Sequence, residues 1–115
     1  MKILIVDDEQ LDLFITKKLL SLEFEVEGFT AIPETLSWAQ QHPFDVVLID
    51  YYLGPNVYAH SVLKELLTLK GNTFKAFVLS NHVDDQQARE LKQAGFAAII
   101  YKPLTLEKFK DQVNA

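Results

Sequence analysis

The chain has 115 residues and contains no cysteine. This excludes disulfide bonds, thiolate metal sites and cysteine nucleophiles. Long apolar stretches are also missing, since no segment approaches the ~20 residues that would span a bilayer. The short apolar run from Ile3 to Val6 ends in the acidic residues Asp7, Asp8 and Glu9, unlike a secretory signal. We therefore expect a cytoplasmic protein without a membrane association.

Basic residues are outnumbered by acidic ones, at 11 against 16, which gives a formal net charge of −5. This balance disfavours direct binding to nucleic acid, because such binding relies on Lys and Arg contacts to phosphate. Hydrophobic residues make up 49% of the chain, which is enough for a real core. The length suits one domain and is too short for two ordinary ones. We expect a single domain over residues 1–115.

Short apolar runs alternate with longer amphipathic stretches. The runs cover Ile3–Val6, Val46–Ile49, Ala76–Leu79 and Ala97–Ile100. Runs that are apolar throughout are typical of strands buried on both faces. One further segment, Phe24–Glu27, alternates apolar and polar residues like a half-exposed strand. We place this segment at an edge of the sheet.

An amphipathic stretch follows each expected strand. The first runs from Gln10 to about Leu22, with Leu11, Phe14, Ile15, Leu19 and Leu22 at helical spacing. The second helix runs from Glu34 to about Gln41 after Pro33, and the third is marked by Val62, Leu63, Leu66 and Leu67 before Gly71. The fourth is opened by Asp84 and Asp85, has Ala88, Leu91 and Ala94 on its inner face, and is capped by Gly95. The last has Leu106, Phe109 and Val113 on one face.

Five strand–helix units in strict alternation predict an α/β fold with a parallel sheet and helices on both faces. A doubly wound five-stranded sheet of flavodoxin-like order 2-1-3-4-5 fits the pattern. In such sheets ligands bind outside the carboxyl ends of the strands.

Chemically active residues follow four of the expected strands: Asp7 and Asp8, then Asp50, then Ser80, then Lys102. Right-handed crossovers bring these strand ends to one edge of the sheet. Clustered carboxylates repel one another unless a cation joins them, and oxygen ligands without imidazole or thiolate favour Mg²⁺ over zinc or copper. One carboxylate can then act as a nucleophile toward a phosphoryl group.

Each of these residues also has a simpler interpretation. The Asp7-Asp8-Glu9 run can cap a helix, Ser80 can cap the next helix, and Lys102-Pro103 can form a turn. The convergence of four separate strand ends favours a common site. There, Lys102 would neutralise phosphoryl oxygens and the Ser80 hydroxyl would donate to one.

The chain resembles the receiver domains of two-component response regulators, most of all the chemotaxis-type single-domain receivers. The resemblance spans essentially the whole chain and is carried by Asp7-Asp8, Asp50, Ser80, Lys102-Pro103 and the intervals between them. It implies a phosphorelay switch that accepts a phosphoryl group on Asp50 from a sensor histidine kinase or a histidine phosphotransfer protein.

The resemblance also implies the ligands of a Mg²⁺ or Mn²⁺ ion: Asp8 and Asp50 directly, Asp7 through water, and the backbone carbonyl of Tyr52. It implies that Ser80 moves toward the attached phosphoryl group and that Lys102 pairs with it. A downstream partner would bind the face of the fourth helix, fifth strand and fifth helix. We expect a monomer or a phosphorylation-dependent dimer. Such a domain promotes its own phosphorylation and dephosphorylation only weakly and is not a metabolic enzyme.

Two regions depart from the family pattern. Ile99 stands where an aromatic residue usually reports phosphorylation; Tyr101 shares its strand face and is expected to take over part of that role, or else to pack on the last helix. The loop Tyr51–Pro55 has its proline one place late, and bulkier residues near Tyr58 replace a usual glycine. His82 could orient water near the phosphoryl group, or simply be an exposed loop histidine.

Three alternatives belong to different functional classes. A degenerate receiver would act only as a protein-interaction module, without phosphorylation. A hydrolase or phosphatase of the same fold would need a substrate pocket, for which 115 residues leave little chain. A flavin-binding protein would need a phosphate loop rich in Gly, Ser or Thr after the first strand, where an acidic cluster stands instead.

Overall fold

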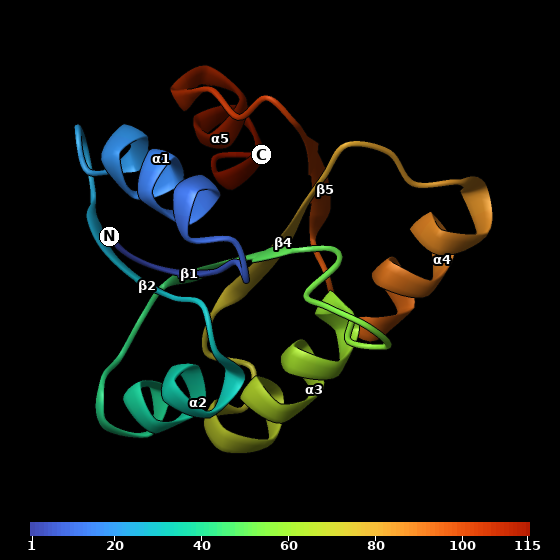
Figure 1. The fold of residues 1–115 in the computed structure, drawn as a ribbon, viewed down its shortest axis with the longest axis horizontal. Helices are drawn as coiled ribbons and strands as arrows, with labels where there is room; N and C mark the ends of the chain where they lie inside the picture. The colour runs from blue at the N-terminus through green and yellow to red at the C-terminus, as the bar shows by residue number, and fades with distance from the viewer.

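In the computed structural model, which describes residues 1–115, five strands alternate with five helices (Figure 1). The strands are β1 (Lys2–Val6), β2 (Glu25–Phe29), β3 (Val46–Asp50), β4 (Lys75–Ser80) and β5 (Ala98–Tyr101). The helices are α1 (Gln10–Leu20), α2 (Ile32–Gln41), α3 (Ala59–Lys70), α4 (Asp85–Ala94) and α5 (Leu106–Val113). None of these helices combines the length and the apolar character that a membrane span requires.

All strand pairs are parallel, and the sheet order is β2-β1-β3-β4-β5. The predicted fold class and strand order are therefore confirmed. β2 lies at an edge of the sheet, as its alternating sequence predicts. β5 forms the other edge and has one fully buried residue, Ile100, although its sequence is as apolar as that of the inner strands.

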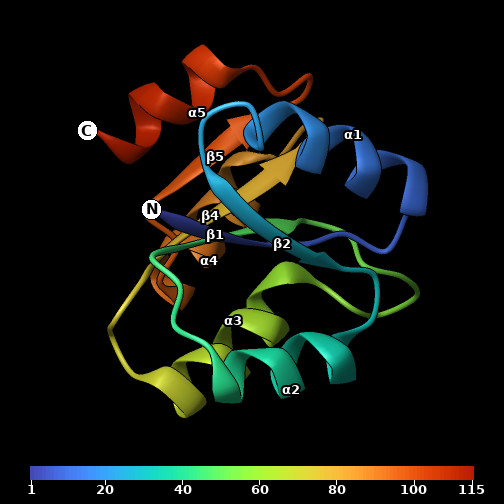
Figure 2. The same ribbon diagram turned by 90° about the vertical axis from the view of Figure 1, so that its left-hand side faces the viewer.

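Helices cover both faces of the sheet, with α1 and α5 on one side and α2, α3 and α4 on the other (Figure 2). Successive strand residues point to opposite faces, so each strand contributes to both cores. On β1, Leu4 and Val6 pack with the α2–α4 layer, whereas Ile3 and Ile5 pack with the α1–α5 layer. The result is a three-layer α/β/α sandwich.

The ends of α3 and α4 follow their sequence signals. Asp84 caps α4: its carboxylate accepts from the Gln87 backbone N–H at 2.7 Å, and the Gln87 side chain accepts from the Asp84 N–H at 2.9 Å. Gly95 ends the helix with φ +118°, a backbone conformation that favours glycine. Gly71 does the same for α3 with φ +64°.

The helices differ in how firmly they are anchored to the sheet. α3 buries four side chains completely, those of Ala59, Val62, Leu63 and Leu66. α4 buries only Leu91, while Ala88 and Ala94 are half-buried beside it. The predicted inner face of α4 is confirmed, but it carries little apolar surface.

α1 turns a different face to the sheet from the one that its apolar spacing suggests. Its buried residues are Leu13, Thr16 and Leu20, and it ends at Leu20 rather than near Leu22. Most of the apolar residues that mark the helix in the sequence are exposed instead: Leu11 by 69%, Phe14 by 58%, Ile15 by 55% and Leu22 by 72%. The helix has apolar residues around most of its circumference, so spacing alone does not identify the core face.

Candidate functional site

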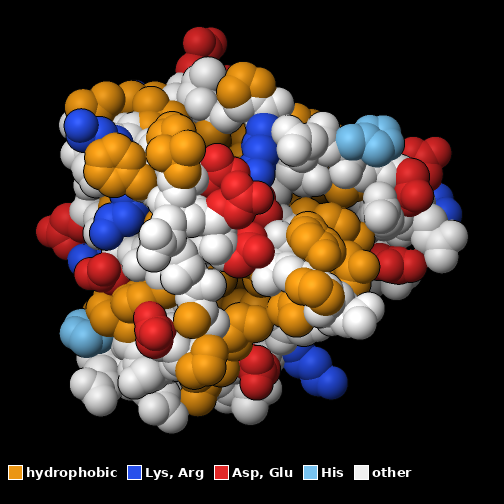
Figure 3. Space-filling view, viewed as in Figure 1, with side chains coloured by type: hydrophobic (Ala, Val, Ile, Leu, Met, Phe, Trp, Pro, Cys, Tyr) orange, Lys and Arg blue, Asp and Glu red, His pale blue; other side chains and the backbone are white.

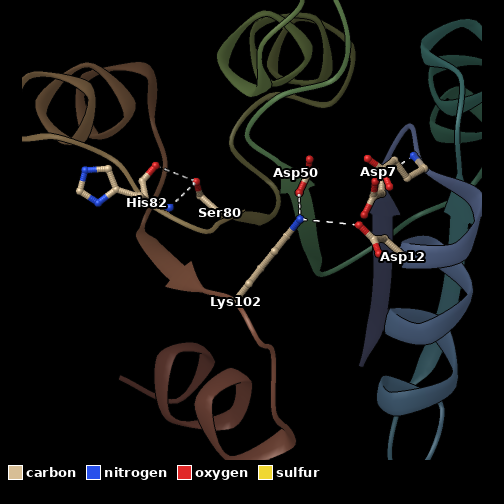
Figure 4. Close-up of polar contacts among 7 residues, drawn as sticks. Asp7, Asp12, Asp50, Ser80, His82 and Lys102 are labelled. Atoms are coloured by element: carbon tan, nitrogen blue, oxygen red, sulfur yellow. Dashed lines mark hydrogen bonds and ion pairs between the residues drawn. The ribbon is translucent and has the colours of Figure 1, made fainter.

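The carboxyl ends of β1, β3, β4 and β5 place the predicted site residues along one edge of the sheet (Figure 4). Asp7 follows β1, Asp50 is the last residue of β3, Ser80 is the last of β4, and Lys102 follows β5. The parallel register sets Asp50 beside Leu79 and Ser80 beside Tyr101. The hydrogen bond from the Lys102 N–H to the Ser80 carbonyl, at 2.9 Å, extends the ladder one residue further.

Asp7, Asp8 and Asp50 form an acidic cluster. Each offers a carboxylate oxygen, and these oxygens all lie within 4.8 Å of one another. Asp7 is only 2% exposed, Asp50 is largely buried and Asp8 is open to solvent. Three oxygen donors with one open side suit a hard divalent cation that keeps several waters.

The electrostatics of the cluster favour a cation. Burial raises the pKa of Asp7 to about 6, against the lowering effect of a hydrogen bond from the Glu9 N–H at 3.0 Å; the nearby Asp50 raises it further. Burial also raises the pKa of Asp50, although the Lys102 ammonium opposes this. The buried carboxylates are thus held in a site that does not stabilise their negative charge by itself.

Lys102 reaches across the sheet edge to Asp50. Its Nζ lies 2.7 Å from Asp50 Oδ1, within hydrogen-bonding range. Burial lowers the pKa of Lys102, but the hydrogen bond and charge of Asp50 more than compensate, and the net pKa is raised. The Lys102 ammonium group therefore stays protonated beside Asp50.

The site contains one residue that the sequence analysis missed. Asp12 on α1 places its Oδ2 3.9 Å from Lys102 Nζ (Figure 4). Asp12 lies in the first turn of α1, which begins directly after the acidic run that follows β1. An aspartate in the helix turn that follows this acidic run is the signal that could have identified it.

Ser80 lies at the same edge of the sheet, but its hydroxyl bonds the backbone of His82 rather than a residue of the acidic cluster. Its Oγ donates to the His82 carbonyl at 3.1 Å and accepts from the His82 N–H at 3.3 Å. The His82 ring itself is exposed and points away from Asp50 (Figure 4). This orientation agrees with the simpler interpretation of His82 as an exposed loop residue.

The loop after Asp50 closes on itself. Tyr52 and Tyr58 form an antiparallel bridge, and their rings lie 5.9 Å apart. Within the loop, the Leu53 N–H donates to the Val57 carbonyl at 2.9 Å. Asn56 has φ +60°, a conformation that asparagine tolerates better than most residues. The bulky Tyr58 is thus part of the loop's internal packing.

Ile99, which replaces the usual aromatic residue, and Tyr101, which is expected to take over part of its role, lie in different environments. Ile99 is half-buried against the core on the α2–α4 side. Tyr101 is 44% exposed near the end of the strand. Whether Tyr101 replaces the usual aromatic residue stays a prediction.

The arrangement defines a doubly wound α/β protein with an acidic pocket and an ammonium group at the carboxyl edge of its sheet. The sequence profile of the response regulator receiver domain matches residues 3–114, so the chain belongs to this family. Receiver domains are signalling domains of two-component systems. The family binds Mg²⁺ at an acidic pocket and interacts with histidine kinases or phosphotransfer proteins.

Solved structures of the same fold cover nearly the whole chain. Chemotaxis protein CheY4 of Vibrio cholerae has a TM-score of 0.86 and 23% identity, covering 98% of this chain and 95% of that one. A CheY-like receiver domain protein of Methanospirillum hungatei JF-1 has a TM-score of 0.82 and 28% identity, covering 98% and 93%. A response regulator of Burkholderia pseudomallei, with a phosphorylated aspartic acid and a calcium ion, has a TM-score of 0.84 and 20% identity, covering 96% and 65%. No curated protein matches this chain in sequence.

Proposed function

We propose that this receiver domain is a cytoplasmic phosphorelay switch whose phosphoacceptor is Asp50. The observation that carries the proposal is the ion pair of 2.7 Å between Lys102 Nζ and Asp50, set beside the three-carboxylate cluster. Catalysis of phosphoryl transfer is mainly positioning and charge neutralisation. It uses a carboxylate nucleophile, a carboxylate cluster that binds a cation, and a nearby ammonium group.

The acidic cluster would hold Mg²⁺ or Mn²⁺. Asp8 and Asp50 would be the direct ligands, Asp7 would bind through water, and the Tyr52 backbone carbonyl would add a further oxygen. The donor set fits, since three carboxylate oxygens lie within 4.8 Å of one another and no nitrogen or sulfur ligand is among them. When bound, the ion neutralises phosphoryl oxygens and the clustered carboxylates. The phosphorylated aspartate and calcium ion of the Burkholderia pseudomallei structure support this chemistry on the same fold.

The transfer step follows from the positions of the side chains. An Asp50 carboxylate oxygen forms a bond to phosphorus while the phosphorus–nitrogen bond of the donor phosphohistidine breaks. The bonding electrons leave with the imidazole, which takes up a proton as it departs. Lys102 turns from Asp50 to the new phosphoryl oxygens. Ser80 exchanges its hydrogen bond to the His82 carbonyl for one to the phosphoryl group.

The surface beside the site offers a docking area for a protein donor. Figure 3 shows hydrophobic side chains over α1 next to acidic side chains at the centre of the same face. Leu11, Phe14 and Ile15 are each more than half exposed. A groove of about 370 Å³ runs from Ile15 on α1 to Lys102, which bonds Asp50. An apolar patch that continues to the acceptor is suited to a kinase or phosphotransfer protein that presents its histidine there.

The output would follow from the movement of Ser80. Ser80 is joined through His82 to the loop that enters α4, and it pairs with Tyr101 on β5. Its hydrogen-bond exchange therefore acts on α4 and β5 together. We place the downstream partner, or a second phosphorylated copy, on the face of α4, β5 and α5. The domain's own phosphorylation and dephosphorylation activities are weak.

The test is the intact mass of the protein after incubation with acetyl phosphate and Mg²⁺. We expect one phosphoryl adduct in the wild type, and none in Asp50→Asn or without Mg²⁺. Asp45→Asn, a change at an exposed aspartate before β3, is the matched control and should still form the adduct. If no adduct forms, the experiment is repeated with a phosphorylated histidine phosphotransfer protein. Failure with both donors would support the degenerate receiver, a module that only binds partners.

A further inference from the structure

Lys108 occupies a position where a lysine is electrostatically unfavourable. It lies in the first turn of α5, where its backbone N–H donates to the capping hydroxyl of Thr105 at 3.1 Å. The N-terminal end of a helix carries a partial positive charge, so acidic residues such as Glu107 are favoured there and cations are not. The exposed Lys108 side chain turns instead to groups outside its own helix.

That interaction is with the segment that carries Lys102. Lys108 Nζ donates to the Pro103 carbonyl at 3.0 Å and to the Tyr101 carbonyl at 3.2 Å. These two carbonyls belong to the residues immediately before and after Lys102. One ammonium group thus holds the backbone on both sides of the residue whose side chain reaches Asp50.

The Tyr101 carbonyl is available to Lys108 because of the sheet topology. The Lys102 N–H donates to the Ser80 carbonyl on β4 at 2.9 Å. In a planar trans peptide unit the C=O and the N–H point in opposite directions, so the Tyr101 carbonyl points away from β4. β5 is an edge strand and has no further strand on that side. A donor from α5 takes the place of the missing strand.

We propose that Lys108 is a positioning residue for Lys102, an inference that rests on the proposed function of the site. Lys102 has a flexible four-carbon stem, so the place of its ammonium group depends on where its backbone is held. The two hydrogen bonds from Lys108 fix that backbone relative to α5. They thereby keep Lys102 Nζ within 2.7 Å of Asp50 and poised for the phosphoryl oxygens.

Lys110 provides a matched control on the same helix. Its Nζ pairs with the carboxylate of Glu23, which lies after the C-terminal end of α1, at 2.9 Å. Removing Lys110 changes the net charge of the domain as much as removing Lys108 does. Lys110→Met therefore reports the effect of charge and of helix stability, without the contact to the Lys102 segment.

The first experiment compares the rates of phosphorylation by acetyl phosphate. Lys108→Met should slow the reaction by about tenfold, as a small misplacement of a catalytic group does. Lys110→Met should keep the wild-type rate, and Lys108→Arg, which retains the donors, should recover most of it. In the Lys102→Met background, adding Lys108→Met should cause no further loss. A wild-type rate for Lys108→Met, or the same loss with and without Lys102, would overturn the proposal.

The second experiment separates this proposal from the proposed function. Amide hydrogen exchange at Lys102 is measured in the protein without a phosphodonor. Exchange should be faster in Lys108→Met than in the wild type, and unchanged in Lys110→Met. If the wild type accepts no phosphoryl group, the proposed function fails, yet the exchange rates still test the backbone contact. Equal exchange at Lys102 in all three proteins would refute the positioning role.

Discussion

At the scale of single residues, the main feature is a set of carboxylates held in an environment that disfavours their charge. Asp7 is almost completely buried, and burial raises its pKa to about 6. Asp50 is subject to the same effect, with Lys102 opposing it. A metal-free protein therefore gives up stability to keep its site ready for a cation. Function and stability are in conflict at these positions, as is common at active sites.

The pKa of Asp7 predicts a pH-dependent stability. Its folded-state pKa of about 6 lies above the usual value of 3.8, so the folded protein binds this proton more tightly than the unfolded chain. The contribution of Asp7 to stability is therefore most favourable below pH 3.8 and is lost as the pH rises through 6. Asp7→Asn should raise the free energy of unfolding of the metal-free protein by about 1–3 kcal/mol at pH 7.5.

Denaturant unfolding with a chelator present, from pH 4 to 8, would measure this effect. The gain from Asp7→Asn should shrink toward pH 4. Asp111→Asn, at an exposed residue of α5, is the control and should show no such trend. A gain that is constant over the whole pH range would assign the effect of Asp7→Asn to packing rather than to charge.

The residues of the site could largely be predicted from the sequence, whereas their hydrogen bonds could not. Asp7, Asp50 and Lys102 each follow an apolar strand, and parallel topology alone brings such positions together. Asp12 and Lys108 lie on helices, where their side-chain directions depend on how each helix packs. The bond of Ser80 to His82 depends on a loop conformation that apolar spacing does not encode.

At the scale of the elements, α1 shows where periodicity stops being informative. Its sequence carries two apolar stripes, and the shorter one, with Leu13 and Leu20, faces the sheet. The larger stripe is exposed, and its Ile15 lines the same groove as Lys102. The glycine caps of α3 and α4 and the acidic cap of α4 were predicted well because such signals act locally. β2 spans Glu25–Phe29 and so ends two residues beyond the predicted Phe24–Glu27. The face that a helix buries is set by tertiary packing instead.

The exposed stripe of α1 predicts a specific defect in phosphotransfer between proteins. Phe14→Asp removes an exposed apolar contact and adds a charge, so transfer from a phosphorylated histidine phosphotransfer protein should slow by about tenfold or more. Phosphorylation by acetyl phosphate should stay unchanged, because Phe14 contacts neither Asp50 nor Lys102. Leu69→Asp, at an exposed leucine of α3, is the control. An equal loss with both donors would mean that Phe14 supports the site rather than a partner.

The packing of α1 on β2 makes a second prediction at this scale. A Cβ added to Gly28 would lie 2.6 Å from Leu13 Cδ1 and 3.2 Å from Lys17 Cδ. Gly28→Ala should therefore destabilise the protein by about 1–3 kcal/mol through overpacking. Combining it with Leu13→Val should cost less than the sum of the single changes, because the two sites are in contact. Strictly additive free energies of unfolding would contradict this contact.

At the scale of the whole molecule, the sheet brings together an acidic cluster and Lys102 from strands that are distant in the sequence. Any ligand that binds the folded protein and not the unfolded chain raises its stability. The acidic cluster is dispersed in the unfolded chain, since Asp50 lies more than 40 residues from Asp7 and Asp8. Binding of a cation by the proposed site would therefore be coupled to folding.

This coupling predicts that Mg²⁺ raises the melting temperature of the wild type beyond what NaCl does at equal ionic strength. At a free Mg²⁺ concentration ten times the dissociation constant, the gain is about 1.4 kcal/mol. Asp8→Asn should lose most of the Mg²⁺ effect while keeping the NaCl effect, which reflects screening of the net charge of −5. A full Mg²⁺ effect in Asp8→Asn would place the cation elsewhere.

A single buried side chain, that of Leu91, anchors α4 to the sheet. A helix with so little buried apolar surface is compliant: shifting or detaching it breaks few contacts, whereas shifting α3 would break many. Under the proposed function, one redirected hydroxyl at Ser80 would therefore be enough to shift α4. α5 likewise buries one side chain, that of Phe109, so the two helices of the proposed output face are both held more lightly than α3.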